Sequence, residues 1–317
     1  MTLAQTQSAE NQSHPLAADV YASRQSPTAD IRERHDPVVH SSEPPTQGLT
    51  AEQAQFYDQN GYLFIERLFS EAEVQRFREE LDRMAASDEI RAMEEAITEP
   101  NSGAVRSIFR AHELSPLFAR LCRDPRILHI AEYLLGDRTY IHQSRINFKP
   151  GFFGKEFYWH SDFETWHMED GMPRMRALSV SISLTDNTEF NGPLIVIPES
   201  HRRYVVCIGE TPEDHYKESL KRQEYGVPDP DSLTQLVDAG GMTSVKGAAG
   251  SVVFFDCNMM HGSNSNISPY PRSNVFYVYN SVENALVDPF CGLKPRPEFI
   301  AARRVEPLEA QPLESPG

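Results

Sequence analysis

The segment FYWHSDFETWHMEDGMP, residues 157–173, is the densest group of residues able to do chemistry in this sequence. It places His160 and Asp162 two positions apart, and residues two apart in an extended backbone point the same way. An imidazole and a carboxylate can therefore reach one point. Much later in the chain, His261 follows in MMHGSN, just after the run GSVVFFD, which is typical of a strand.

Two imidazoles and one carboxylate form a set of ligands that binds Fe(II) and leaves coordination positions open. Arg272 stands 11 residues after His261 and begins the run RSNVFYVYNS, where its guanidinium could hold a carboxylate through two parallel hydrogen bonds. A His-x-Asp pair alone is weak evidence in a chain with 11 histidines, and an arginine alone is often a solvated surface residue. Together the four residues favour a metal centre beside a carboxylate-binding group.

The elements that would position these residues are short and extended. After Gly136 the runs TYIHQSRINFK, RALSVSISL, GPLIVIP, GSVVFFD and SNVFYVYNSV are rich in Val, Ile, Phe and Tyr and are separated by turn residues, which predicts strands. RALSVSISL alternates, so its two faces differ. The apolar face holds Leu178, Val180, Ile182 and Leu184, and the polar face holds Ser179, Ser181 and Ser183. We expect the apolar face to meet a core and the polar face to line a lumen.

The part from Thr50 to Gly136 has a helical pattern. Ser70 and Glu73 have the spacing of a capping box at the start of a helix. Farther on, Pro125 is expected to begin a helix that Gly136 ends. Helices followed by a series of strands predict an α+β domain, mainly β at its core, built around a small sandwich or barrel.

The two ends of the chain differ from this middle part. Residues 1–48 are rich in Ser, Gln, Pro, Ala and charged residues, and residues 305–317 have a similar composition. Such stretches bury too little apolar surface to offset the entropy of ordering, so we expect both to be disordered tails. Residues 49–304 are then expected to form a single domain.

Composition excludes several classes of protein. A net charge of −16 argues against a nucleic-acid partner, because binding to phosphates needs a basic surface. No apolar run is long enough for a membrane span, and the N-terminus resembles neither a secretory nor a transit signal, so we expect a cytoplasmic protein without a membrane partner. The four cysteines are scattered, which predicts reduced and mostly buried thiols.

The order His-x-Asp, His, Arg on a strand-rich half resembles the phytanoyl-CoA dioxygenase-like branch of the 2-oxoglutarate oxygenases. NGPLIVIPESH, residues 191–201, is similar to the strand and turn between that branch's iron-binding motifs. Within the branch, residues 157–173 resemble the signature of the ectoine hydroxylases at every defined position. The resemblance extends from about Gly61 to Pro289.

This resemblance implies a double-stranded β-helix (jelly-roll) with flanking helices, and a homodimer. It implies Fe(II), held by His160, Asp162 and His261, with 2-oxoglutarate and O2 as cosubstrates. The activity would be hydroxylation of ectoine to 5-hydroxyectoine, with succinate and CO2 as co-products, in the metabolism of compatible solutes. Related halogenases carry a small residue in place of the carboxylate, so Asp162 favours hydroxylation.

The resemblance also assigns residues around the metal. Those expected to bind 2-oxoglutarate are Arg272, Asn147 and Lys149. Those expected to bind the substrate are Gln143, Trp166, Ala177, Ser179, Asn274, Phe276 and Phe255. A delocalised cation such as that of ectoine suits the face of an indole. Glu164 and His167 have no evident ligand role, and we expect them to orient His160 or to shape its loop.

Three other functions stay open at this point. The chain could be a hydroxylase of the same family that acts on another small zwitterion. It could also be an osmolyte-binding protein without activity, although a binder has no need of the metal ligands or of Arg272. A zinc hydrolase is disfavoured, because no positioned general base stands out.

Overall fold

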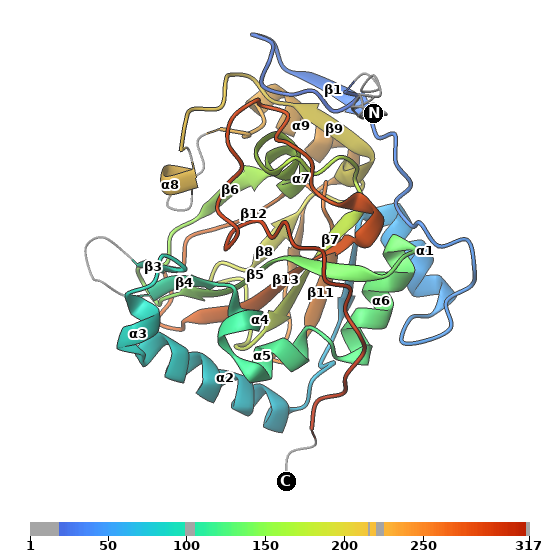
Figure 1. The fold of residues 1–317 in the computed structure, drawn as a ribbon. Helices are drawn as coiled ribbons and strands as arrows, with labels where there is room; N and C mark the ends of the chain where they lie inside the picture. The colour runs from blue at the N-terminus through green and yellow to red at the C-terminus, as the bar shows by residue number, and fades with distance from the viewer. Residues whose placement is uncertain (1–18, 99–104, 215, 220–224, 315–317) are drawn as a thin grey trace, which may run out of the picture.

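The structure, a computed structural model, describes residues 19–98, 105–214, 216–219 and 225–314. Two antiparallel sheets form its centre, and helices lie against the larger sheet (Figure 1). In order across it, the larger sheet has β2 (Tyr62–Ile65), β11 (Val252–Asp256), β7 (Ala177–Ser183), β13 (Arg272–Ser281), β5 (Thr139–Lys149), β4 (Val105–Phe109) and β3 (Ala96–Thr98). The smaller has β10 (Thr243–Val245), β8 (Leu194–Val196), β12 (His261–Ser263) and β6 (Phe157–His160).

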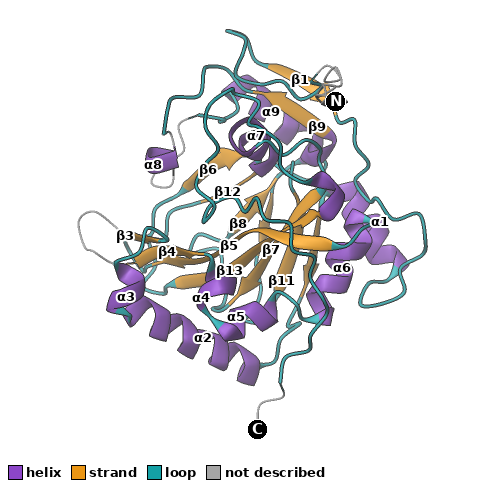
Figure 2. Ribbon diagram, in the orientation of Figure 1, coloured by secondary structure: helices purple, strands orange, loops and turns teal. Residues whose placement is uncertain are grey.

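The helices are mostly short and come from both halves of the chain (Figure 2). The longer ones are α1 (Ala51–Asn60), α2 (Glu71–Ala86), α6 (Pro125–Leu135) and α9 (Pro230–Gly240). The shorter ones are α3 (Asp88–Arg91), α4 (Ala111–Leu114), α5 (Pro116–Leu121), α7 (Asp162–Thr165) and α8 (Tyr216–Ser219), with a π-helical turn η1 (Trp166–Asp170) and 3-10 turns η2 (Ser200–Arg202) and η3 (Val282–Asn284). The mainly β class with flanking helices is therefore confirmed.

The ends of the predicted helices are those that the residue types indicated. The Ser70 side chain accepts a hydrogen bond from the backbone of Glu73, whose carboxylate accepts one from the backbone of Ser70. Pro125 begins α6, and Gly136 ends it in the left-handed region at φ 58°. The stretch between residues 50 and 136 is nevertheless not all helix, since β2, β3 and β4 interrupt it.

One face of the larger sheet packs on an apolar core, and the other face carries polar and apolar side chains. Leu178, Val180 and Ile182 of β7, with Leu184 just after it, belong to one buried cluster with side chains of α2, α5 and α6. On its other face the register aligns rows of residues from neighbouring strands. One row is Gln143, Val278, Ser179 and Phe255, and the next is Arg145, Phe276, Ser181 and Val253. The expected alternation of β7 is confirmed.

The expected disorder of residues 1–48 is wrong for residues 19–48. Tyr21 is 1% exposed and Arg24 is 3% exposed. A short strand, β1 (Asp30–Glu33), pairs antiparallel with β9 (Arg203–Val206). The expectation was based on the low apolar content of this segment. The segment is held instead by buried hydrogen bonds and ion pairs, which are described below. Residues 1–18 lie outside the described residues.

The C-terminal expectation is corrected in the same way for residues 305–314. Leu308 is 5% exposed, and its backbone N–H donates to the carbonyl of Thr139. The backbone N–H of Gln311 donates to the carbonyl of Arg123. This segment therefore lies against the domain, while residues 315–317 fall outside the described part of the chain.

Two further expectations concern cysteines and membranes. All four cysteines are free, and Cys122, Cys207 and Cys257 are buried. Burial raises the pKa of the Cys122 thiol to about 12, so this sulfur stays protonated and inert. Among the described residues, no helix has the length and apolar character needed to cross a membrane.

Gly171 ends η1, and a substitution there would test how closely the segment after β6 packs against the chain around Val287. Its φ is 81°, and a Cβ added there would lie 2.0 Å from the carbonyl oxygen of Val287. Gly292 has a similar φ of 75° but nothing within 4 Å of an added Cβ. We expect Gly171→Ala to lower the free energy of unfolding by at least about 3 kcal/mol, and Gly292→Ala by about 1–2 kcal/mol. Urea unfolding measures both, and equal losses would contradict the close approach.

Candidate metal centre

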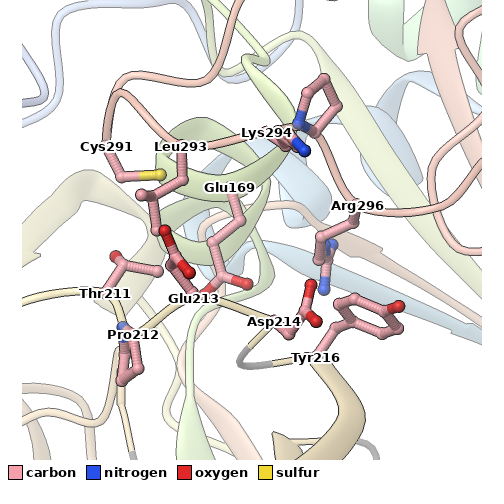
Figure 3. A pocket seen from close by; sticks show the side chains of 11 residues that line it. Glu169, Thr211, Pro212, Glu213, Asp214, Tyr216, Cys291, Leu293, Lys294 and Arg296 are labelled. Atoms are coloured by element: carbon pink, nitrogen blue, oxygen red, sulfur yellow. The ribbon is translucent and has the colours of Figure 1, made fainter.

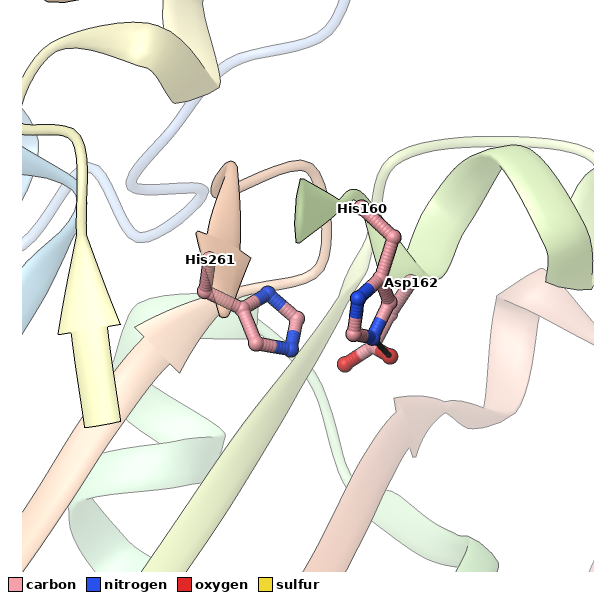
Figure 4. Close-up of side chains that lie close together, drawn as sticks. All are labelled: His160, Asp162 and His261. Carbon is pink, nitrogen blue, oxygen red and sulfur yellow. Dashed lines mark ion pairs between the residues drawn. The ribbon is translucent and has the colours of Figure 1, made fainter. Parts of the chain in front are cut away.

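His160, Asp162 and His261 meet because of the way β6 and β12 pair. The two strands are antiparallel, and His261 lies directly opposite His160. Ser161 continues the extended backbone at φ −105° and ψ 131°, and α7 then begins at Asp162. One ligand atom from each of the three side chains lies within 4.8 Å of the others (Figure 4). The extended step expected from the His-x-Asp spacing therefore brings both side chains to one point.

Backbone carbonyls orient both imidazoles. Nδ1 of His160 lies 2.7 Å from the carbonyl oxygen of Tyr158, and Nδ1 of His261 lies 2.9 Å from that of Met259. These contacts assign the proton to Nδ1 and leave the lone pair of Nε2 free for a metal. Burial, followed by the neighbouring His261, lowers the pKa of His160 to about 4. The neutral imidazole, which is the form that binds metals, is thus the stable one near neutral pH.

Asp162 completes the group as an ionised carboxylate. Its burial raises the pKa, but the two imidazoles, Arg145 and a hydrogen bond from Ser179 together hold the pKa below its usual value. Ser179 Oγ donates to Oδ2 at 3.1 Å. Two neutral imidazoles and a carboxylate suit Fe(II) and other borderline divalent ions. Within the described ranges, no other set of three His, Cys, Asp or Glu side chains converges in this way.

A buried guanidinium lies beside His160, Asp162 and His261, which are called here the metal group. Arg272 begins β13, is 8% exposed and lines one cavity with His160, His261, Asn147 and Phe276. Its Nη1 lies 3.3 Å from Oδ1 of Asn274, and its Nε has no hydrogen-bond partner among the described residues. Burial lowers the pKa of Arg272 to about 10, which leaves it charged at neutral pH. A buried cation without an acidic partner favours an anionic ligand.

Asn147 and Lys149 occupy different places around that cavity. Asn147 lines it, and its Oδ1 accepts a hydrogen bond from Ser107 at 2.8 Å. Lys149 is not among the lining residues. Its Nζ donates to Oγ of Ser263, which does line the cavity, at 2.8 Å, and to the carbonyl of Asn264 at 2.7 Å. Burial, then Arg272 and Arg106, lower the pKa of Lys149 to about 6.

The residues expected to bind substrate lie on four strands of the larger sheet, except Trp166, which lies in η1. Phe255 has its ring centroid 5.0 Å from that of His261. Trp166 and Ala177 are buried in one cluster together with Val278. Gln143 Nε2 donates to the carbonyl of Ile300 at 2.7 Å. The remaining three are Ser179, which binds Asp162, Asn274, which donates to Ser181, and Phe276, which lines the cavity of Arg272.

Arg145 was given no binding role from the sequence, yet it lines the same cavity as Arg272. Its guanidinium lies over the ring of Phe276, 5.2 Å from the centroid. Its Nε has no hydrogen-bond partner among the described residues, and burial lowers its pKa. The signal was present in the sequence, because alternation puts Arg145 on the face of β5 that also carries Gln143 and Asn147.

Glu164 and His167 do not touch His160, so the expectation that they orient it is wrong. Glu164 accepts hydrogen bonds from Ser23 and Arg24, and His167 contacts Asp19 and the carbonyl of Met172. His160 is oriented by its own strand instead. The alternative expectation, that these side chains shape the loop, agrees with their positions.

A larger cavity of about 230 Å³ lies beside η1, between residues 211–214 with Tyr216 and residues 291–296 (Figure 3). Glu169 and Arg296 line it, and none of the three residues of the metal group does. Arg296 forms a paired hydrogen bond with Asp170, at 2.7 and 2.6 Å. This cavity therefore borders the element that follows Asp162 and is separate from the metal group.

Comparison with known proteins agrees with this geometry. Residues 57–274 match the phytanoyl-CoA dioxygenase family, and the matched part contains all three residues of the metal group and Arg272. The chain belongs to the phytanoyl-CoA dioxygenase family.

One relative and two solved structures illustrate the similarity. An ectoine dioxygenase from Bordetella bronchiseptica is 59% identical over 298 residues, covering 93% of this chain and 97% of that protein. The crystal structure of EctD from S. alaskensis with 2-oxoglutarate and 5-hydroxyectoine is 48% identical, has a TM-score of 0.84 and covers 94% of this chain and 99% of that one. EctD from S. alaskensis with bound Fe is 47% identical, with a TM-score of 0.83 and coverage of 93% and 99%. The expected fold is thereby confirmed.

The metal group predicts a loss of binding when one imidazole is removed. We expect His261→Ala to weaken Fe(II) binding by at least about 100-fold, since even residues that only support a ligand typically contribute 10- to 100-fold. Anaerobic titration with Fe(II) measures the affinity. His129→Ala, in α6 and outside the group, is the matched control and should bind as the unaltered protein does. Equal affinities for the two variants would exclude His261 as a ligand.

Proposed function

We propose that this protein is an Fe(II)- and 2-oxoglutarate-dependent ectoine 5-hydroxylase. It would convert ectoine, 2-oxoglutarate and O2 to 5-hydroxyectoine, succinate and CO2. The observation that carries the proposal is the convergence of His160, Asp162 and His261 beside Arg272. Its specificity for ectoine is supported by relatives 47–59% identical over most of the chain that are ectoine dioxygenases, and by the EctD structure that holds 5-hydroxyectoine.

His160, Asp162 and His261 are proposed to hold the iron. When bound, Fe(II) would supply the activation of O2, with 2-oxoglutarate as the source of electrons. The protein's own part is to fix the orientation of both imidazoles, through the carbonyls of Tyr158 and Met259. Ser179 would keep the Asp162 carboxylate in one orientation. The presence of this carboxylate supports hydroxylation over halogenation.

Arg272, Asn147 and Lys149 are proposed to bind 2-oxoglutarate. Arg272 would pair with its distal carboxylate, because the guanidinium is buried and its Nε lacks a partner among the described residues. Asn147 lines the same cavity, and its amide is already turned by Ser107. Lys149 would add positive charge from behind that wall.

Ectoine is proposed to bind between Trp166 and the polar face of the larger sheet. The delocalised ring cation suits the indole face of Trp166, which is already fixed against the apolar cluster around Ala177. Its carboxylate needs donors, and Arg145 offers a guanidinium whose Nε has no partner among the described residues. Ser179 would contact the substrate from the same face, although its hydroxyl hydrogen is already donated to Asp162. Gln143, Asn274, Phe276 and Phe255 would complete the walls. Their packing would hold one C–H bond of the ring near the metal and exclude water.

Two properties expected from the sequence stay predictions. They are the homodimer, which the family resemblance implies, and the cytoplasmic location. The single domain of residues 49–304 is retained in the proposal with two additions, since residues 19–48 and residues 305–314 also pack against it.

Anaerobic reconstitution with Fe(II) and 2-oxoglutarate, followed by ectoine and air, tests the function. We expect 5-hydroxyectoine, identified by its mass, and one succinate for each product molecule. His160→Ala should abolish both products, because one of the proposed ligands is gone. Turnover of another zwitterion such as proline, without turnover of ectoine, would favour the alternative substrate class. Ectoine binding without succinate at a verified iron content would favour a non-catalytic binder.

Lys149 predicts that binding of 2-oxoglutarate depends on pH. Burial and the charges of Arg272 and Arg106, partly offset by Glu156, lower its pKa to about 6, so it is mainly neutral above that pH. An arriving carboxylate favours the ammonium, so binding takes up a proton. The affinity should then fall as pH rises above 6, by up to about tenfold per pH unit.

Titrations of 2-oxoglutarate between pH 6 and pH 8, with Mn(II) at saturation, measure this dependence. Lys149→Arg should bind well at every pH in this range, because a guanidinium keeps its charge. Lys149→Met should bind weakly with little dependence on pH. The same slope in Lys149→Met as in the unaltered protein would assign the pH dependence to another group.

A further inference from the structure

Residues 19–36, called here the N-terminal strap, lie against the two segments that carry the residues of the metal group. Figure 1 shows β1 and β9 beside α7, at the end of the molecule away from α2. The strap lies outside the part of the chain that matches the phytanoyl-CoA dioxygenase family, residues 57–274. The match to the Bordetella ectoine dioxygenase covers 93% of the chain and so extends well beyond that part. The role of the strap inferred below rests on the proposed hydroxylase function.

Arg24 is the first point of contact between the strap and the segment that carries Asp162. Its Nε and Nη2 donate to the two carboxylate oxygens of Glu164 at 2.9 and 2.6 Å. Its Nη1 donates to Glu169 at 2.6 Å and to Thr211 Oγ1 at 3.0 Å. The side chains of Arg24, Glu164 and Glu169 are 1–4% exposed. Glu164 stands two residues after Asp162, so this fork fixes the helical turn that begins at Asp162.

The backbone around Arg24 is fixed as well. Arg24 has a φ of 54°, in the left-handed region that is unfavourable for a non-glycine residue. Its N–H donates to the carbonyl of Cys207, while Ser23 Oγ accepts from the N–H of Cys207 and donates to Glu164 at 2.7 Å. Tyr21 packs edge to face on Phe163, the residue after Asp162, with centroids 5.1 Å apart. The strained conformation is therefore held by contacts on both sides.

Arg34 is the second point of contact and reaches the segment that leads to His261. Its Nη1 donates to Asp256 at 2.7 Å, and both side chains are 3–4% exposed. Asp256 also accepts the N–H of Asn258, and the carbonyl of Asp256 accepts the N–H of Met259. The carbonyl of Met259 is the group that orients His261. Arg34 thus stabilises the turn that sets the direction of this imidazole.

The two supported segments are joined to each other directly. Ser161, between His160 and Asp162, donates through Oγ to Oδ1 of Asn258 at 3.0 Å. Burial of the Glu164 and Asp256 carboxylates would be unfavourable without paired cations. The strap supplies both cations, from positions only ten residues apart.

We propose that the N-terminal strap is a positioning element of the metal centre, in which Arg24 fixes the turn of Asp162 and Trp166, and Arg34 fixes the turn before His261. Neither arginine touches the three residues of the metal group, so both act through Glu164 and Asp256. Loss of either contact should loosen the metal group and misplace Trp166 relative to it. The strap then governs how tightly metal binds and how faithfully decarboxylation of 2-oxoglutarate is coupled to hydroxylation.

Arg24→Gln and Arg24→Lys test the first contact. Both should lower the affinity for Co(II), titrated without substrate, by at least about tenfold, as supporting residues of metal sites typically do. With Fe(II), 2-oxoglutarate and ectoine, both should release more succinate than 5-hydroxyectoine. The ratio of the two products does not depend on the folded fraction, so a purely structural role would not change it.

Arg32→Gln is the matched control, since Arg32 lies in the same strap but pairs with Asp30 at the surface, with 42% of its side chain exposed. It should keep the Co(II) affinity and a product ratio of one. Arg24→Lys keeps the buried positive charge and so has the better chance of folding, although its single ammonium cannot form the fork with Glu164. If a folded Arg24 variant matches Arg32→Gln in both measurements, the proposal is overturned.

Hydrogen exchange on the unaltered protein tests the proposal without any variant. Because coupling between two sites is reciprocal, Co(II) together with 2-oxoglutarate should slow exchange at the amides of Arg24 and Cys207 at least about fivefold. Exchange in α2 should change much less, since α2 packs on the opposite side of the larger sheet. Unchanged exchange in the strap would overturn the proposal. Absent turnover of ectoine would refute the proposed function instead, and the Co(II) affinities would still decide the role of the strap.

Discussion

The register of β6 against β12 is the constraint on which the chemistry of this protein depends. It places His261 opposite His160, and a slip of one residue would turn one imidazole out of the lumen. Further contacts fix this register on both sides of the pair. β8 holds the other edge of β12, while Ser161 and Asn258 connect the ends of the two strands. Only one extended residue, Ser161, separates Asp162 from His160, so the strand that positions the imidazole also positions the carboxylate.

The basic side chains beside this pair form no ion pair with a carboxylate in the described part of the chain. Burial lowers the pKa values of Arg272 and Lys149, and Arg145 lies over an aromatic ring. Such an arrangement is unfavourable for the protein alone, because desolvation of the charges is not offset by an ion pair. Anionic ligands would relieve this cost. The same unfavourable energy that limits stability therefore favours binding of carboxylates such as 2-oxoglutarate.

Away from this cavity, the described residues include several buried charges that form ion pairs. Arg24 with Glu164 and Glu169, Arg34 with Asp256, and Arg296 with Asp170 are all buried pairs. They join the chain's two ends to the segments around the metal group. Paired buried charges add little stability compared with apolar packing, but removing one partner is costly. They therefore specify one arrangement of these segments, which suits a site that needs fixed geometry.

The sequence by itself determined the metal group, Arg272, the class of fold and the alternation of β7, because these follow from local spacing and from a long, specific signature. It also determined the helix ends at Ser70 and Gly136, where single residues set the backbone. Only the tertiary structure showed the partners of Glu164, His167 and the N-terminal strap. Their partners lie about 140 residues apart in the chain, and composition counts apolar surface but not the buried ion pairs that order a polar segment.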